Sequence, residues 1–263
     1  MRLLQAHPLL RGGTGLNGAP AGSPAGAGSI AERLAGVRDR IEEACRRAGR
    51  PADGVTLVGA SKTQPASALV EALQAGLSDF GENRVQEGLA KSDELGPEMT
   101  GQMEWHLIGP LQSNKVRVAL DLFHIIHSID RPRIAEAIDR EAGARGFVIL
   151  GFLEINLGGE ETKHGFPAAG LAETILALSR LRHLRIIGLM AIPPQGDTPE
   201  ASRPWFRRLR ELRDEIAARP EWAGFPGCLS MGMSDDYAVA IEEGATHVRV
   251  GTAVFGPRRA PGP

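Results

Sequence analysis

Cysteine is scarce in this chain of 263 residues, which contains only Cys45 and Cys228. So few cysteines exclude a fold held by several disulfides, and they fit a reducing cytoplasm, where we expect the protein to reside. The sequence also lacks an apolar run long enough to span a bilayer. No charge of either sign dominates, since 30 basic and 32 acidic residues give a net charge of -2. That balance argues against nucleic acid or an anionic membrane as a partner.

Acidic residues are missing from residues 1–28, where glycine, alanine and proline dominate from Gly12 to Gly28. Such a segment buries too little apolar surface to order itself, so we expect a disordered tail at 1–28, a domain at 29–256 and a flexible tail at 257–263. The tail contains a G-x-G-x-x-G pattern from Gly13 to Gly18. It is not a dinucleotide site, because no strand precedes it and no helix follows it.

The remainder of the chain alternates between strand and helix patterns. Ser29 and Glu32 form a capping box that predicts the start of a helix ending near Gly49. Strands are predicted at 55–61, 79–82, 104–108, 122–128, 148–157, 185–192, 227–231 and 247–250. Helices are predicted at 65–75, 84–95, 113–120, 131–144, 168–181, 199–218 and 234–243. Eight strands alternating with helices predict an α/β fold, a closed (β/α)8 TIM barrel preceded by an N-terminal helix.

Short punctuation signals place several helix ends in this pattern. Gly76, Gly146 and Gly244 stand where three of the predicted helices should stop. Thr198 precedes Pro199, which is typical of an N-cap followed by a proline at the first helical position.

A lysine marks the first candidate site, because active groups of such barrels project from the C-terminal ends of the strands. Lys62 directly follows the apolar strand 55–61. An amine in that place can form an imine with an aldehyde. The neighbouring Ser61 and Thr63 are small and leave room for a ring.

The end of the chain supplies a candidate phosphate site. Ser230 and Ser234 flank a glycine just before a predicted helix, an arrangement that offers hydroxyl and backbone N–H donors to an anion. Gly251 and Thr252 end the last predicted strand, which neighbours the first strand when a barrel closes. An aldehyde site and a phosphate site on one rim together indicate pyridoxal 5'-phosphate (PLP) as cofactor.

Three further residues are candidates for contacts with the pyridine ring of PLP. Arg249 alternates with two valines and therefore points into the barrel, where a buried arginine needs an acceptor such as the pyridine nitrogen. Arginine leaves that nitrogen unprotonated, which favours racemase-like chemistry or simple cofactor holding. Asn83, directly after the second predicted strand, and His106, within the third, could approach the same ring.

Six ordered motifs carry a family resemblance that covers residues 29–256. They are Ser-Lys-Thr at 61–63, Phe-Gly-Glu-Asn at 80–83, Trp-His-Leu-Ile-Gly-Pro-Leu-Gln-Ser-Asn-Lys at 105–115, Gly-Leu-Met-Ala-Ile-Pro at 188–193, Ser-Met-Gly-Met-Ser at 230–234 and Val-Arg-Val-Gly-Thr at 248–252. The chain resembles the pyridoxal phosphate homeostasis proteins, single-barrel relatives of the N-terminal domain of alanine racemase. One departure is Arg84, where the family commonly has a tyrosine, so no role of that ring carries over.

The resemblance implies a monomeric barrel that holds PLP as an imine on Lys62. It further implies that the phosphate lies at Ser230, Ser234, Gly251 and Thr252 and that the ring nitrogen faces Arg249. Such proteins are thought to hold and supply PLP (vitamin B6) inside the cell without robust catalysis, which makes PLP-dependent apoenzymes the candidate recipients.

Two enzymatic alternatives stay open at this point. A PLP-dependent racemase or decarboxylase would need a second acid/base group besides Lys62, and the candidates are His106 and Tyr237, the single tyrosine of the chain. In alanine racemase that group is a tyrosine of an additional β domain, which we expect this chain to lack. A lysine-imine aldolase or sugar-phosphate enzyme would share the barrel, Lys62 and the phosphate site, but would have no use for Arg249 at a ring nitrogen.

Overall fold

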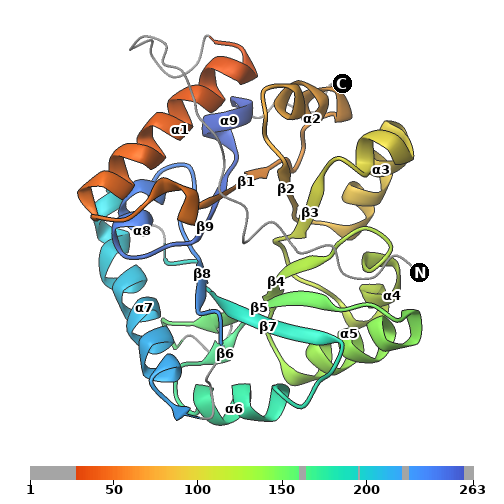
Figure 1. The fold of residues 1–263 in the computed structure, drawn as a ribbon, viewed down its shortest axis with the longest axis vertical. Helices are drawn as coiled ribbons and strands as arrows, with labels where there is room; N and C mark the ends of the chain where they lie inside the picture. The colour runs from red at the N-terminus through yellow and green to blue at the C-terminus, as the bar shows by residue number, and fades with distance from the viewer. Residues whose placement is uncertain (1–27, 160–163, 195, 221–224, 258–263) are drawn as a thin grey trace.

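Eight parallel strands close into a barrel in the computed structural model, which describes residues 28–159, 164–194, 196–220 and 225–257 (Figure 1). The strands are β1 (Thr56–Ala60), β2 (Asp79–Glu82), β3 (Glu104–Leu107), β4 (Ile125–Ile129), β5 (Ile149–Asn156), β7 (Leu184–Met190), β8 (Cys228–Ser230) and β9 (His247–Val250). Each strand pairs with the next, and β9 pairs with β1. A ninth strand, β6 (Phe166–Pro167), pairs with the end of β5 and was not predicted. The predicted TIM barrel is confirmed.

Helices surround these strands on the outside of the barrel, as Figure 1 shows. They are α1 (Ile30–Arg47), α2 (Ala66–Gln74), α3 (Val85–Thr100), α4 (Val116–Ala119), α5 (Pro132–Arg145), α6 (Leu171–Leu178), α7 (Arg203–Ala217), α8 (Tyr237–Glu242) and α9 (Thr252–Phe255). Short 3-10 helices occur at Ala52–Gly54, Ser113–Lys115 and Pro199–Ser202. Among the described residues, no helix has both the length and the apolar character needed to cross a membrane.

The predicted helix ends are confirmed where side chains or glycines determine them. The Ser29 backbone N–H donates to Glu32 Oε2 at 2.7 Å and Ser29 Oγ accepts from the Glu32 N–H at 3.2 Å, which completes the capping box of α1. Gly76, Gly146 and Gly244 adopt positive φ angles of 88°, 75° and 99° directly after helices, a conformation that favours glycine. Thr198 occupies the N-cap position before Pro199, as predicted, although its side chain makes no capping hydrogen bond.

Several helices differ from the prediction, and three of the differences concern α3, α8 and α9. Helix α3 continues beyond residue 95 to Thr100, with a break at Gly96, where φ is 75°. The predicted helix 234–243 begins only at Tyr237, because Asp236 Oδ1 instead accepts a hydrogen bond from the Met233 N–H at 2.7 Å and closes a turn. The four-residue helix α9 was not predicted, since four residues carry too little periodicity to recognise.

Apolar side chains pack in two layers on either side of the strands. The larger cluster lies between the strands and the helices, and a smaller one fills the barrel interior with Ile125, Phe152, Ile187, Met190 and Cys228. Cys228 is a free, buried cysteine, and burial raises the pKa of its thiol, so it behaves as an apolar core residue. The interior also contains buried polar side chains, from which the candidate site is built.

The domain boundaries predicted from composition remain predictions. The tails at 1–28 and 257–263, including the G-x-G-x-x-G pattern, lie outside the described residues apart from Gly28 and Pro257. The ordered elements of the described part begin with α1 and end with α9.

Candidate ligand-binding site

Lys62 lies at the C-terminal mouth of the barrel, two residues beyond the end of β1. Val58 pairs with the interior residue Arg249 in the register of β1 and β9. Side chains of a strand alternate between its two faces, so Val58, Ala60 and Lys62 share the interior face. Lys62 is half-buried, and its amine makes no hydrogen bond or ion pair with any residue that the structure describes. An amine in this position is available to a ligand.

A buried ionic cluster fixes the backbone on both sides of Lys62. Lys91 Nζ donates to Glu82 Oε1 at 2.6 Å and to the carbonyl oxygen of Ser61 at 2.8 Å, and Ser61 Oγ donates to the same Glu82 oxygen at 2.6 Å. Glu87 pairs with Lys91 at 3.1 Å and accepts a hydrogen bond from the Thr63 N–H. Thr63 has a φ of 64°, an unfavourable conformation for a β-branched residue. The cluster therefore holds the strained turn that contains Lys62 and Thr63.

Glu82 is fully buried within this cluster. Burial raises the pKa of its carboxyl, and the neighbouring Lys91 and Ser61 lower it only in part. Glu82 Oε2 has no hydrogen-bond partner in the described part of the chain, so the carboxylate depends on the donors that reach Oε1. Losing one of those donors should therefore lower the free energy of unfolding.

Replacing Lys91 with methionine tests how strongly this cluster is coupled. The variant keeps the length of the side chain but removes its charge and its hydrogen bonds, so the free energy of unfolding should fall by roughly 1–3 kcal/mol. The double variant Lys91→Met, Glu82→Gln should lose clearly less than the sum of the two single losses, because the two side chains share one bond. Urea unfolding measures all four proteins, and additive losses would contradict a coupled pair.

Three of the predicted phosphate-binding residues come together at the same mouth, where the turn after β8 meets the turn after β9; we call these two hydrogen-bonded segments the Ser234 turn. Ser234 Oγ accepts hydrogen bonds from the backbone N–H of Gly251 at 3.1 Å and of Ala253 at 3.4 Å. Thr252 is exposed and begins α9. A Cβ atom at position 251 would lie 3.2 Å from the carbonyl oxygen of Ala60, so glycine allows this turn to approach the strand that ends next to Lys62. Gly251, and with it the hydrogen-bonded Ser234, thus lies next to Ala60, two residues before the lysine.

A line of hydrogen bonds joins Arg249 to the opposite wall of the barrel. Arg249 Nη1 donates to Ser230 Oγ at 2.5 Å, and His127 Nδ1 lies 2.7 Å from the same oxygen. His127 Nε2 lies 2.9 Å from His106 Nδ1, and His106 Nε2 lies 3.1 Å from Asp79 Oδ1. We call these five residues the histidine chain. It connects β9 and β8 with β4, β3 and β2 through the barrel interior.

Burial sets the charge states within the histidine chain. Burial lowers the pKa of Arg249 to about 10, so the guanidinium remains a cation at neutral pH. Burial also lowers the pKa of His127 well below its ordinary value, and electrostatic interactions with His106, His247 and Arg249 add to the effect. His127 is therefore neutral, and its ring stacks on Phe152 with a centroid separation of 4.5 Å.

Three of the predicted PLP-binding residues are not simply open to a ligand at the mouth. They are Ser230, His106 and Asn83. Ser230 is fully buried and already bonded to Arg249 and His127, so phosphate could reach its hydroxyl only by displacing one of them. His106 is fully buried and lies between Asp79 and His127. The Asn83 side chain is half-buried and without a hydrogen bond to the described residues, in a turn whose backbone packs closely on Gly109.

Sequence reasoning singled out neither His127 and Asp79 in the histidine chain nor Glu82 and Lys91 beneath Lys62. One signal was present for His127, because it lies two residues after Ile125 on a strand that was predicted. Period-two alternation then places both side chains on one face. No comparable signal identified Lys91, whose partners come from two other elements.

Tyr237, the other candidate for a second acid/base group, lies in the packing layer outside the barrel. It is the first residue of α8, and only 2% of it is exposed. Burial raises the pKa of its phenol. The ring is therefore packed outside the barrel, away from the interior face on which Lys62 lies.

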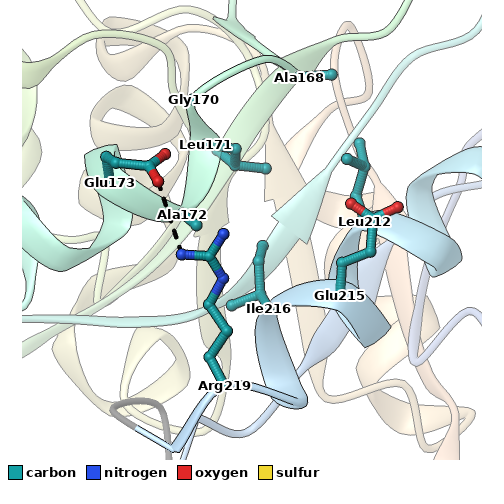
Figure 2. Close-up of a pocket in the computed structure, with 9 residues that line it drawn as sticks. All are labelled: Ala168, Gly170, Leu171, Ala172, Glu173, Leu212, Glu215, Ile216 and Arg219. Atoms are coloured by element: carbon teal, nitrogen blue, oxygen red, sulfur yellow. Dashed lines mark ion pairs between the residues drawn. The ribbon is translucent and has the colours of Figure 1, made fainter.

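A surface hollow between α6 and α7 is separate from this mouth. Figure 2 shows its lining, with Glu173 and Arg219 facing each other as an ion pair at 3.6 Å. Its other walls come from Leu171, Leu212 and Ile216. None of the predicted cofactor-binding residues lines it. In the described part of the chain, no group of three or more His, Cys, Asp or Glu side chains is arranged to hold a metal ion.

Comparison with known proteins identifies the family of this barrel. The family model described as alanine racemase, N-terminal domain, matches residues 33–259. The pyridoxal phosphate homeostasis protein of Aquifex aeolicus (strain VF5) is 46% identical over 228 residues, which cover 87% of this chain and 98% of that protein. The chain belongs to the pyridoxal phosphate homeostasis protein family. Its counterpart of that name in Escherichia coli (strain K12) is 44% identical over 233 residues, covering 87% and 97% of the two chains.

Solved structures place this family member among related barrels. PipY of Synechococcus elongatus PCC7942, solved with PLP bound, is 40% identical with a TM-score of 0.75, and the match covers 86% of this chain and 100% of PipY. Alanine racemase of Clostridium difficile 630 matches with a TM-score of 0.62 at 11% identity, over 86% of this chain and 55% of the racemase. The second likeness shows a shared fold alone.

Proposed function

We propose that this protein binds PLP as an imine on Lys62 and serves intracellular PLP homeostasis, holding and supplying the cofactor without robust catalysis. The observation that carries the proposal is the common mouth of Lys62, Arg249 and the Ser234 turn. Lys62, whose amine has no partner among the described residues, follows the strand that pairs with β9, and β9 carries the buried guanidinium of Arg249 and leads into the Ser234 turn. PLP has an aldehyde, a phosphate and a ring nitrogen, and these groups match the three features.

Each group of PLP has a candidate partner in this chain. Lys62 supplies the amine for the aldehyde, and the hydroxyls of Ser234 and Thr252 supply donors for the phosphate, while the Gly251 N–H would have to leave Ser234 Oγ in order to donate to it. Two N–H groups of Arg249 are bonded to Ser230 and to the carbonyl oxygen of Ala191, and the others make no hydrogen bond with the described residues. A guanidinium has five such donors, so the ring nitrogen can accept one of them.

Three other predicted contacts have weaker support. Ser230 and His106 are bonded into the histidine chain, so we propose that they act on the ring through Arg249. Asn83 remains a candidate for direct contact, because its side chain has no hydrogen bond to the described residues. The names of the relatives and the PLP-bound structure of PipY support the cofactor itself.

The positions of the two acid/base candidates support the proposed absence of robust catalysis. PLP supplies an electron-withdrawing ring when it is bound, but racemisation also needs a second group opposite Lys62. His106 is bonded on both ring nitrogens and Tyr237 is packed outside the barrel, so neither candidate is placed for that role. Arginine at the ring nitrogen favours holding the cofactor over stabilising charge on it.

Two measurements together test the holding function. Protein loaded with PLP and freed of excess cofactor by desalting should retain about one equivalent and should restore activity to an added PLP-dependent apoenzyme. The same protein, incubated with amino acids in deuterated water, should exchange no α-proton above the rate of free PLP. Rapid exchange would favour the racemase or decarboxylase alternative. Protein that retains no PLP would favour a lysine-imine aldolase or sugar-phosphate enzyme. Light scattering of the loaded protein tests the proposed monomer.

A further inference from the structure

The histidine chain has one consistent direction of proton donation. Its far end is Asp79, the first residue of β2, whose side chain is 22% exposed. Burial raises the pKa of the Asp79 carboxyl, but hydrogen bonding to His106 and Ser78 lowers it, and the net shift is downward. At neutral pH this carboxylate can only accept, so His106 Nε2 must carry the proton that it shares with Asp79.

The direction at Asp79 propagates through both imidazoles. When the His106 ring carries its single proton on Nε2, its Nδ1 is an acceptor, and His127 Nε2 then donates to it. Nδ1 of the neutral His127 is then the acceptor for the Ser230 hydroxyl, and the hydroxyl oxygen accepts from Arg249. Every donor in the chain meets an acceptor. In the reverse direction, His127 and Arg249 would both donate to Ser230, and the hydroxyl proton would have no acceptor within the chain.

The far carboxylate therefore determines how the arginine is held. Ser230 Oγ is oriented by His127, and the carbonyl oxygen of Ala191 fixes a second corner of the guanidinium at 3.2 Å. Arg249 is 4% exposed and His106 and His127 are fully buried, so water has little access to replace a lost partner. A change at the N-terminal rim of the barrel can thus reach the C-terminal mouth through four hydrogen bonds.

We propose that Asp79, His106 and His127 are positioning residues that fix the tautomers of the histidine chain and thereby orient Arg249 toward the ring nitrogen of PLP. This inference rests on the proposed function, in which that nitrogen faces Arg249. The three residues do not touch the cofactor. Their role is to keep the Ser230 hydroxyl turned toward His127, which leaves its oxygen free to accept from Arg249.

The direction of the chain can be measured without any cofactor. Nitrogen-15 NMR of the imidazole rings at pH 8 distinguishes protonation on Nε2 from protonation on Nδ1. The protein contains seven histidines, whose signals can be assigned with single His→Gln variants. Both His106 and His127 are expected as neutral Nε2–H tautomers. Protonation of either ring on Nδ1, or on both nitrogens, would overturn the proposed direction.

The positioning role is tested by removing the far carboxylate. Asp79→Leu eliminates the acceptor, and both histidines should then exchange between tautomers while PLP binding weakens by up to about tenfold, the cost of roughly one lost hydrogen bond. Glu104→Gln is the matched control, because Glu104 pairs with Asp79 in the register of β2 and β3 but lies near His124, outside the chain. That control should keep the wild-type tautomers and PLP affinity.

Three readouts separate this inference from the proposed function. If Asp79→Leu does not fold, Asp79→Asn replaces it, since the amide keeps the shape but no longer favours one tautomer. Tautomers that change together with PLP affinity support the positioning role, whereas affinity equal to that of Glu104→Gln overturns it. Wild-type protein that binds no PLP refutes the proposed function and, with it, the role assigned to Arg249. The NMR result would still determine the direction of the chain.

Discussion

Replacing Lys62 with alanine is expected to abolish the visible absorption band that PLP gives in the wild-type protein. Lys62 is half-buried and its amine has no partner among the described residues, so it is available to react with the aldehyde. The variant keeps the Ser234 turn and Arg249, so weak binding should persist. We expect the retained PLP to dissociate about 100-fold more readily, which corresponds to roughly 2.7 kcal/mol. Absorption spectra before and after desalting measure both effects.

Lys115→Ala is the control for this prediction. The chain contains four lysines, and Lys115 is half-buried like Lys62 but lies in the 3-10 helix after β3. Its loss should leave the absorption band and the retention of PLP unchanged. An absorption band that persists in Lys62→Ala would contradict the assignment of Lys62, even if the protein still binds one equivalent of PLP.

Replacing Gly188 with alanine is expected to have the largest effect on stability. A Cβ atom at position 188 would lie 2.0 Å from the carbonyl oxygen of Cys228 and 2.6 Å from its carbonyl carbon. Both atoms belong to the backbone of the neighbouring strand, so no side-chain rotation relieves the contact. The two residues pair in the register of β7 and β8. We expect the free energy of unfolding to fall by more than about 3 kcal/mol, above the usual cost of overpacking.

The same substitution should also damage the site. Ala191 follows β7 and Ser230 ends β8, and both hold Arg249. Separating the two strands would move these acceptors apart. Gly36→Ala is the control, because Gly36 is exposed in α1 and a Cβ there meets no atom within 4 Å. It should stabilise the protein by about 0.5–1 kcal/mol through its helix propensity. Equal urea midpoints for the two variants would contradict this account of Gly188.

The barrel could be predicted from the sequence because its signals are local. Alternating apolar runs and helical periods gave eight strands, and the exact bounds of β2 and β9 followed from them. The capping box at Ser29 and the glycines after α2, α5 and α8 also act within a few residues. Strand-end positions then placed Lys62 and Gly251 on one rim, which the pairing of β1 with β9 bears out.

The hydrogen-bonding partners could not be predicted, since they join residues far apart in the chain. His127 and Ser230 are separated by 103 positions, and Lys91 meets the backbone of Ser61 across 30. The phosphate prediction treated Ser230 and Ser234 as a pair, but alternation and the turn at Gly232 send one into the barrel and the other to the rim. The alternation of side chains along a strand indicates on which face a residue lies. Only the closed barrel determines which residues lie opposite it.

Borohydride reduction of the PLP-loaded wild-type protein, followed by mass mapping of its peptides, tests the central claim most directly. Reduction makes the imine permanent, and four lysines give few peptides to distinguish. The account predicts a single pyridoxyl label on Lys62. A label on Lys115 or Lys163, or no label on a protein that retains PLP, would contradict it.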